Sequence, residues 1–216
     1  MDVNPAWLEP TWYLDSESPE IDEFARQAVG DAMDTHEMAI RLFYAVRDGF
    51  RYDPYALDRE PEAYRASAIV QRDSGWCVPK SIVLAAVARN RGIPARLGFA
   101  DVRNHLSSEK LMETMGTDLF AWHGYAELLL DEDWVKLSTA FNIELCERFG
   151  VKALEFDGDS DALMHPYDVA GNRHMEYVLQ RGSFDDLPFK EIFATFAEVY
   201  PESMTASNIN DEAFHQ

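Results

Sequence analysis

The chain has 216 residues, of which 47% are hydrophobic and 27% charged, a balance typical of a globular protein with a sizeable core. Its 39 acidic residues against 19 lysines and arginines give a net charge of −20. We therefore expect neither nucleic acid nor an anionic membrane surface as a partner, because both would repel such a chain.

The sequence has no apolar run long enough to span a membrane and shows no secretory signal. It contains only two cysteines, which favours the reducing cytoplasm as its location. No Cys-x-x-Cys or His-Glu-x-x-His spacing occurs, so we expect neither a metal nor another cofactor.

Several helices are predicted before residue 73. Ser18 and Pro19 supply an N-cap and a first-position proline, which predicts a helix over residues 19–33. Asp34 caps a second helix, which Gly49 ends. The remaining segments are an irregular arm over 1–18, an aromatic connector over 50–55 that we interpret as packing, and a short helix over 61–72.

The stretch from residue 74 to residue 102 predicts a tight loop, a buried helix and a strand. Every residue from Ile82 to Ala88 is apolar, which is typical of a helix surrounded by other elements. Gly92 ends this helix and Pro94 prevents it from resuming. The strand then covers residues 95–102.

Cys77 lies where the loop becomes the helix. The unpaired N–H groups and the dipole of a helix start favour a thiolate there. A buried cysteine that acts as a small hydrophobe is the alternative interpretation. A nucleophilic role requires a partner base.

The second half of the chain predicts more strand than helix. Residues 123–130 and 134–141 read as two strands around an acidic turn, which indicates an antiparallel hairpin. The other predictions are a loop with a short helix (107–115) within 103–122, a helix over 143–149, a strand over 175–179, a helix over 188–199 and a disordered tail from residue 204.

His123 is the candidate base, because it begins a strand beside a long loop. A histidine in this position is by itself more often structural. A cysteine at a helix start and a histidine at a sheet edge, however, are separate elements that a fold can bring together, and cysteine nucleophiles are built in this way.

Five segments resemble the transglutaminase-like superfamily, whose members are related to papain-type cysteine proteases. They lie within residues 20–142 and read FRYDPY (50–55), GWC (75–77), RNRGIPAR (89–96), WHGYAE (122–127) and DWVKL (133–137). The resemblance implies an α+β fold in which N-terminal helices and a central buried helix pack on an antiparallel sheet. The length of the chain favours one domain over 1–216. The resemblance covers its core, over about 20–142, and leaves a C-terminal extension over 143–203 and the tail over 204–216 unassigned.

The resemblance implies Cys77 as the nucleophile and His123 as the general base. The family's third member is an aspartate, and Ser138 stands at that position here. A serine can hydrogen-bond an imidazole but supplies no negative charge, so Asn142 is a second candidate for orienting His123. Asp168 and Glu176 are further alternatives for this role.

An oxyanion donor is needed as well. Gln71 precedes the cysteine by the separation of the oxyanion glutamine in papain-type enzymes, and the N–H of Cys77 is another candidate. The implied reaction is acyl transfer through a thioester on Cys77, with a peptide or protein amide as substrate.

Water or an amine acceptor would resolve the thioester, and the resemblance favours water. The alternative function is a catalytically silent binding or scaffold domain, which the serine at position 138 favours. A metal-dependent hydrolase built from His165, Asp168 and His174 is the least supported hypothesis. The sequence leaves the substrate's identity and the oligomeric state open.

Overall fold

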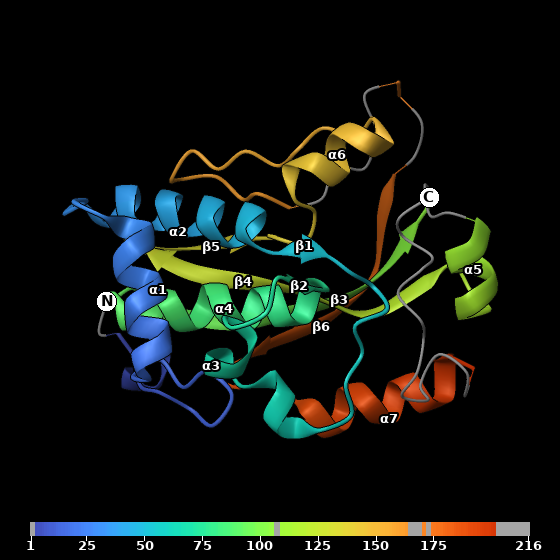
Figure 1. The fold of residues 1–216 in the computed structure, drawn as a ribbon, viewed down its shortest axis with the longest axis horizontal. Coiled ribbons are helices and arrows are strands. Elements are labelled where there is room, and N and C mark those ends of the chain that lie inside the picture. The colour runs from blue at the N-terminus through green and yellow to red at the C-terminus, as the bar shows by residue number, and fades with distance from the viewer. Residues whose placement is uncertain (1–2, 106–108, 164–169, 172–173, 202–216) are drawn as a thin grey trace.

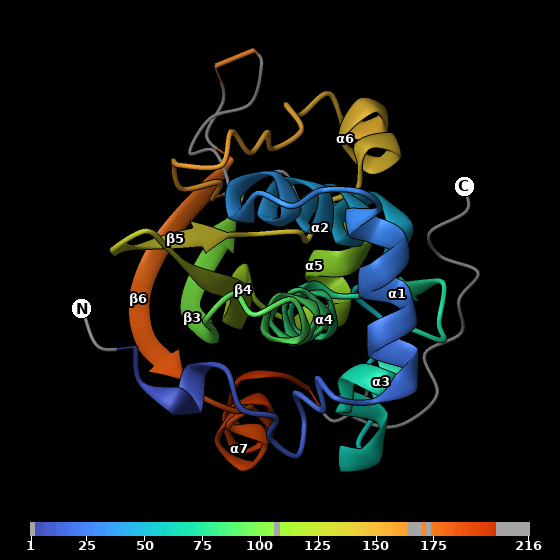
Figure 2. The same cartoon turned by 90° about the vertical axis from the view of Figure 1, so that its left-hand side faces the viewer.

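A computed structural model describes residues 3–105, 109–163, 170–171 and 174–201. Helix α4 (Cys77–Asn90) lies in the middle of the molecule, and every residue from Cys77 to Arg89 is buried. Figure 2 looks nearly along this helix and shows helices on one side of it and a sheet on the other. The buried-helix prediction is confirmed, and so is the α+β fold class.

The helical side is formed by α1 (Pro19–Val29), α2 (Thr35–Gly49) and the short α3 (Ala66–Ile69), all of which pack against α4. Helix α1 ends at Val29, earlier than predicted, because Gly30 adopts a φ of +57° and interrupts the helix. Helix α2 begins as predicted, with the Asp34 side chain accepting the Glu37 N–H at 3.0 Å.

The other side is a four-stranded antiparallel sheet in the order β5-β4-β3-β6 (Figure 1). Its strands are β3 (Ala95–Asn104), β4 (Leu119–Leu130), β5 (Asp133–Leu137) and β6 (Met175–Phe184). Strand β4 starts before His123, so the histidine lies inside the strand and not at its beginning.

Strand β5 is shorter than predicted and ends at Leu137. The Ser138 N–H donates to the Ala162 carbonyl at 2.9 Å, and the Ala162 N–H donates to the Lys136 carbonyl at 2.9 Å. These bonds draw the chain out of the four-stranded sheet, so residues 138–141 are not part of the predicted hairpin.

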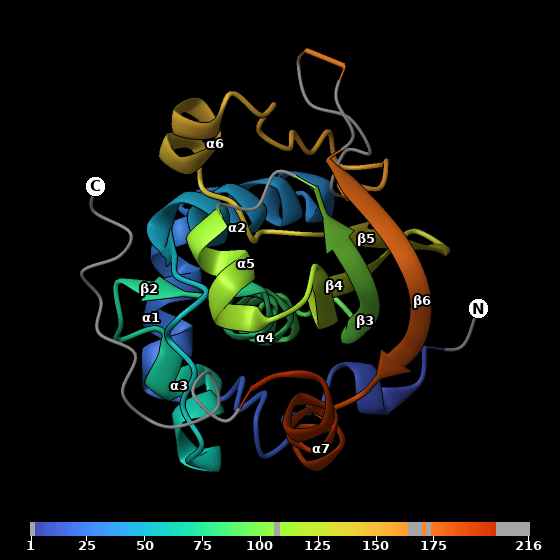
Figure 3. The same ribbon diagram turned by 90° about the vertical axis from the view of Figure 1, so that its right-hand side faces the viewer.

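The remaining elements surround this frame. Figure 3 shows β6 curving along the outside of the sheet, with α7 near one of its ends. The elements are η1 (Pro5–Trp7), η2 (Pro61–Tyr64), the parallel pair β1 (Arg51–Tyr52) and β2 (Ser74–Gly75), α5 (Glu109–Met115), α6 (Ile143–Phe149) and α7 (Phe189–Val199). The β1–β2 pair was not predicted, and the tail from residue 204 lies outside the described residues. No helix among the described residues is long and apolar enough to cross a membrane.

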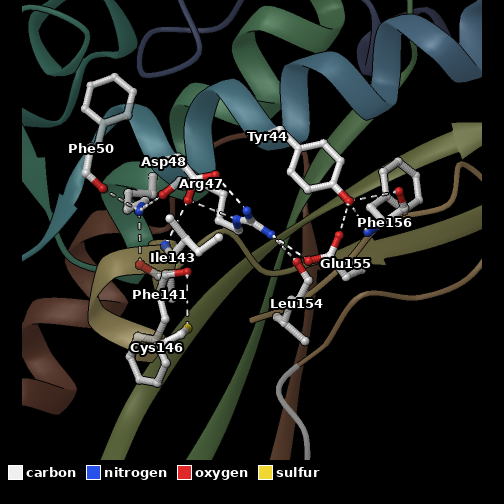
Figure 4. Close-up of polar contacts among 12 residues, drawn as sticks. Tyr44, Arg47, Asp48, Phe50, Phe141, Ile143, Cys146, Leu154, Glu155 and Phe156 are labelled. Carbon is white, nitrogen blue, oxygen red and sulfur yellow. Dashed lines mark hydrogen bonds and ion pairs between the residues drawn. The ribbon is translucent and has the colours of Figure 1, made fainter. Parts of the chain in front are cut away.

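Two buried cations connect α2 to the chain that follows β5. The ammonium of Lys80, which is fully buried, donates to the carbonyls of Arg47 at 2.8 Å, Phe50 at 2.7 Å and Ala140 at 3.0 Å. Arg47 donates to the carbonyl of Leu154 and pairs with Asp48 at 2.7 Å. Figure 4 shows these contacts between the end of α2 and the segments around α6.

Replacing Lys80 with methionine should lower the free energy of unfolding by about 2–4 kcal/mol, because three buried carbonyls lose their donor. Burial lowers the pKa of Lys80 to about 7, so the unfolded state binds more protons between that pH and the ordinary lysine value of about 10.4. The gap between wild type and variant should therefore widen as the pH rises through this range.

Urea unfolding at several pH values measures this gap. Lys190→Met is the matched control, because Lys190 is exposed on α7. Equal stabilities for the two variants would contradict a structural role for the Lys80 ammonium.

Candidate active site

Cys77 is placed by a tight pairing of two short strands before α4. The Arg51 N–H donates to the Asp73 carbonyl at 2.9 Å, and the Asp53 N–H donates to the Gly75 carbonyl at 3.1 Å. Trp76 follows in an extended conformation, and Cys77 begins the helix. The connector over residues 50–55 is thereby fixed beside the start of α4.

The sulfur of Cys77 lies against β4. The backbone N–H of Gly124 donates to Sγ at 3.4 Å. A Cβ at Gly124 would come within 3.0–3.1 Å of Val78, in the first turn of α4. Glycine at this position is therefore what allows β4 to approach the helix closely enough to contact the thiol.

His123 precedes Gly124 and pairs with Ala100 of β3. The residue before it, Trp122, has a φ of +58°, which is rare for a side chain of this size. The register between β3 and β4 shifts at this position. A bulge of this kind changes the direction in which the neighbouring side chain points.

A buried ion pair holds the bulge. Asp101 accepts the Trp122 N–H at 2.9 Å and forms two bonds with Arg181, at 2.6 and 2.8 Å. The Arg181 guanidinium also lies 4.7 Å from the centroid of the Trp122 ring. Asp101 lies on β3 and its partner Arg181 on β6, and no local sequence pattern links the two.

Cys77 and His123 line the same partly open cavity, whose volume is about 40 Å³. Both side chains are nearly buried, with exposed fractions of 6% and 5%. Among the described residues, no hydrogen bond joins the sulfur to the imidazole. The other lining residues are Tyr52, Pro54, Leu57, Trp76, Met115, Phe120, Ala121, Phe196 and Tyr200.

Burial sets the ionisation of both groups. It raises the pKa of the Cys77 thiol to about 11, and the N–H groups of Gly124, Val78 and Cys77 oppose this only in part. It lowers the pKa of His123 to about 4. At neutral pH the site therefore holds a neutral thiol and a neutral imidazole.

Ser138 is buried at the position where the family has its aspartate. Within the described part of the chain, neither its Oγ nor Nε2 of His123 has a hydrogen-bond partner. The Asn142 Oδ1 accepts the Tyr52 N–H at 3.1 Å, so this side chain fixes the connector. Glu176 contacts His105 at 3.2 Å, and Asp168 lies outside the described residues.

Gln71 is not brought to the cavity. Its side chain is exposed, and its amide donates to the Ser67 carbonyl at 3.1 Å. The N–H of Cys77 remains at the helix start as an oxyanion candidate.

Of the residues considered for a metal site, His174 is buried with its ring stacked on Phe141 at 6.0 Å, and His165 lies outside the described residues. The described residues contain no group of three metal-ligating side chains.

Most of the cavity wall was not predicted from the sequence. Tyr52 belongs to the aromatic connector that was interpreted as packing. Phe196 and Tyr200 come from the end of α7 and the residue after it, more than seventy positions beyond His123. No local signal connects these aromatic residues to the cysteine, because the contact depends on how α7 docks.

Comparison with solved structures finds the same fold in a protein from Cytophaga hutchinsonii titled a "putative cysteine protease". The TM-score is 0.54 at 13% identity, and the match covers 93% of this chain and 52% of that one. This chain therefore spans about half the length of that protein. A protein from Parabacteroides distasonis titled a "putative protease" matches with a TM-score of 0.41 at 16% identity, over 62% of this chain and 26% of that one.

Comparison with curated proteins finds no match. Among family models, the one described as the transglutaminase-like superfamily matches residues 22–139, which is more than half of the sequence. The match includes the start of α4 and all of β4, and with them both Cys77 and His123. The protein therefore belongs to the transglutaminase-like superfamily.

Proposed function

We propose that the protein is a cysteine-dependent acyl-transfer enzyme that hydrolyses a peptide or side-chain amide through a thioester on Cys77. The observation that supports this most is that Cys77, at the start of α4, and His123, on β4, line one partly open cavity. A helix start that faces a histidine across a cleft is the arrangement in which thiol nucleophiles work.

The ionisation states suggest how the first step proceeds. The imidazole is neutral at physiological pH and can accept a proton, whereas the buried thiol is not ionised in advance. Proton transfer from Sγ to His123 therefore accompanies attack of the sulfur on the carbonyl carbon. The new C–S bond leaves an oxyanion, which the N–H of Cys77 is placed to receive at the helix start.

The later steps return the proton and release the products. The oxyanion collapses, the C–N bond breaks, and the imidazolium protonates the departing amine. A water molecule, deprotonated by His123, then attacks the thioester and releases the acid. An amine in place of water would give transamidation by the same chemistry.

The proposed site gives a reason for the division of the chain into a core and a C-terminal extension. The core over residues 20–142 carries Cys77 and His123, and the extension over 143–203 completes the cavity with Phe196 and Tyr200. Both parts then act as one domain, as the sequence predicts.

One observation favours a catalytically silent domain as the second candidate. Nε2 of His123 and Oγ of Ser138 are buried without partners in the described structure. A site without an acidic group to stabilise an imidazolium would be a weak catalyst. The reactivity of the Cys77 thiol distinguishes the two candidates.

Wild-type Cys77 should react with iodoacetamide at pH 7 about 100-fold faster than Cys77 in the His123→Ala variant, because the imidazole supplies general-base catalysis. Since burial lowers the pKa of His123 to about 4, the base form persists as the pH falls. The difference in rate should therefore remain at pH 5 and disappear only below about pH 4.

Mass spectrometry of the alkylated protein follows this reaction. A Cys146→Ala background removes the second thiol, which is buried on α6. His36→Ala is the matched histidine control, because His36 contacts the Gly158 carbonyl at 2.9 Å and is not among the residues that line the cavity. Equal rates with and without His123 would favour the silent domain.

Asp101→Asn should slow the His123-dependent alkylation about tenfold, because a small misplacement of a catalytic group has a large effect on rate. It should also reduce the free energy of unfolding by about 1–3 kcal/mol, since Arg181 loses its ionised partner. Asp118→Asn is the control, because Asp118 pairs with Arg103 at 3.6 Å where both side chains are exposed. A loss of stability with an unchanged alkylation rate would limit Asp101 to a structural role.

A further inference from the structure

Among the described residues, none that lines the cavity around Cys77 carries a permanent charge. The chain carries 39 acidic residues, yet no aspartate, glutamate, lysine or arginine is among the residues that line this space. Apart from Cys77 and His123, the polar side chains of the wall are those of Tyr52, Tyr200 and Trp76. We propose that this cavity is an acyl-binding site that selects short, uncharged, apolar acyl groups, an inference that rests on the proposed function.

The wall has few polar groups, and one of them is already hydrogen-bonded to the backbone. The hydroxyl of Tyr200 accepts the Ala121 N–H at 2.7 Å and donates to the Leu119 carbonyl at 3.2 Å. It is therefore used by the backbone of β4 and is not available to a ligand. The hydroxyl of Tyr52 remains as the only phenol in the wall without a hydrogen bond shown among the described residues.

Aromatic packing makes the rest of the wall apolar and fixed. The Tyr52 ring packs edge-on against Phe141, with centroids 4.9 Å apart, and Trp76 contacts Phe196 at 5.8 Å. Such contacts hold large rings in place and leave a hydrophobic surface. Transfer of an apolar ligand group from water into this cavity is favourable. A polar group would find few hydrogen-bonding partners there.

Three charged residues near the cavity have partners outside it. Asp101 is bound to Arg181 and to the Trp122 N–H. Asp53 accepts the Tyr55 N–H at 2.9 Å, and Lys80 donates to three carbonyls. A carboxylate or ammonium that entered the cavity would be buried without a counter-charge, which proteins strongly disfavour.

The size of the cavity sets how much of an acyl group it can enclose. A volume of about 40 Å³ holds roughly three groups of the size of water or a methyl. An acyl chain of about four carbons, counted from the carbonyl that Cys77 attacks, therefore fills the space. Longer chains would extend through the open side of the cavity.

A pair of aldehydes of equal length tests the selection directly. Butyraldehyde and succinic semialdehyde differ in that the terminal methyl of the first is a carboxylate in the second. Each forms a reversible hemithioacetal: the Cys77 sulfur bonds to the carbonyl carbon, and the thiol proton goes to the carbonyl oxygen. Binding is measured as protection of Cys77 from iodoacetamide in the Cys146→Ala background.

Butyraldehyde should protect Cys77 at a concentration at least about 100-fold lower than succinic semialdehyde, because the carboxylate would be buried unpaired. Shortening the neutral aldehyde to acetaldehyde should weaken protection about fourfold per methylene removed. Equal protection by butyraldehyde and succinic semialdehyde would overturn the inference and leave the proposed function intact. A thiol that neither aldehyde protects would contradict the proposed function itself.

A positive charge placed in the wall should weaken the selection against a carboxylate. Leu57 lines the cavity and is only half-buried, so Leu57→Arg can introduce a cation without disrupting the core. This variant should reduce the preference for butyraldehyde at least tenfold, since the guanidinium pairs with the carboxylate. Val178→Arg is the matched control, because Val178 is 50% exposed on β6, and it should leave the preference unchanged. An equal effect of both variants would show that the net charge of the protein, and not the wall, sets the selection.

Discussion

The contact between Gly124 and the first turn of α4 is the constraint on which the site depends. The N–H of Gly124 donates to the Cys77 sulfur, and a single added carbon at Gly124 would collide with Val78. The sheet and the helix are therefore in close contact at the residue that follows His123. This close approach helps to bring a thiol and an imidazole to the same cavity.

The close approach of β4 to α4 also explains why the thiol and the imidazole are both neutral. Excluding water disfavours both a thiolate and an imidazolium, so burial moves the two pKa values apart and leaves the pair neutral. A neutral pair needs no acidic third member at rest, which is consistent with a serine at position 138. Under the proposed function, the energetic cost of charging the imidazole arises only when the sulfur attacks, and the bulge that Asp101 and Arg181 hold lies directly before His123 in the chain.

The sequence was informative wherever local pattern decides structure. The uninterrupted apolar run from Ile82 to Ala88 predicted the buried helix, and the pairing of a cysteine at its start with a histidine in a later strand pointed to two residues that line one cavity. Gln71 shows where this reasoning fails. Its separation from Cys77 matched an oxyanion glutamine, but α3 has only four residues. The chain therefore turns before Gln71, and its amide bonds to Ser67 instead of facing the cavity.

Contacts between distant elements were not predictable in the same way. The bulge at Trp122 requires a carboxylate on β3 and a guanidinium on β6, and one sequence cannot show that these strands are neighbours. Ser138 was assigned to the family's aspartate position from the preceding pattern, and that assignment stays a prediction. Its surroundings depend on Ala162, which draws the chain away from the sheet after Leu137.

Under the proposed function, the residues that carry out the reaction and some of the residues that contact the acyl group come from different parts of the chain. Cys77, His123 and Gly124 lie within residues 22–139, the part that matches the family. Phe196 and Tyr200 lie beyond it, and Met115 and Phe120 come from the stretch between β3 and the middle of β4. Under the proposed function, a change at these wall residues would reshape the cavity while the chain keeps its thiol and its imidazole. The aromatic wall is therefore where this chain would set its preference for an acyl group.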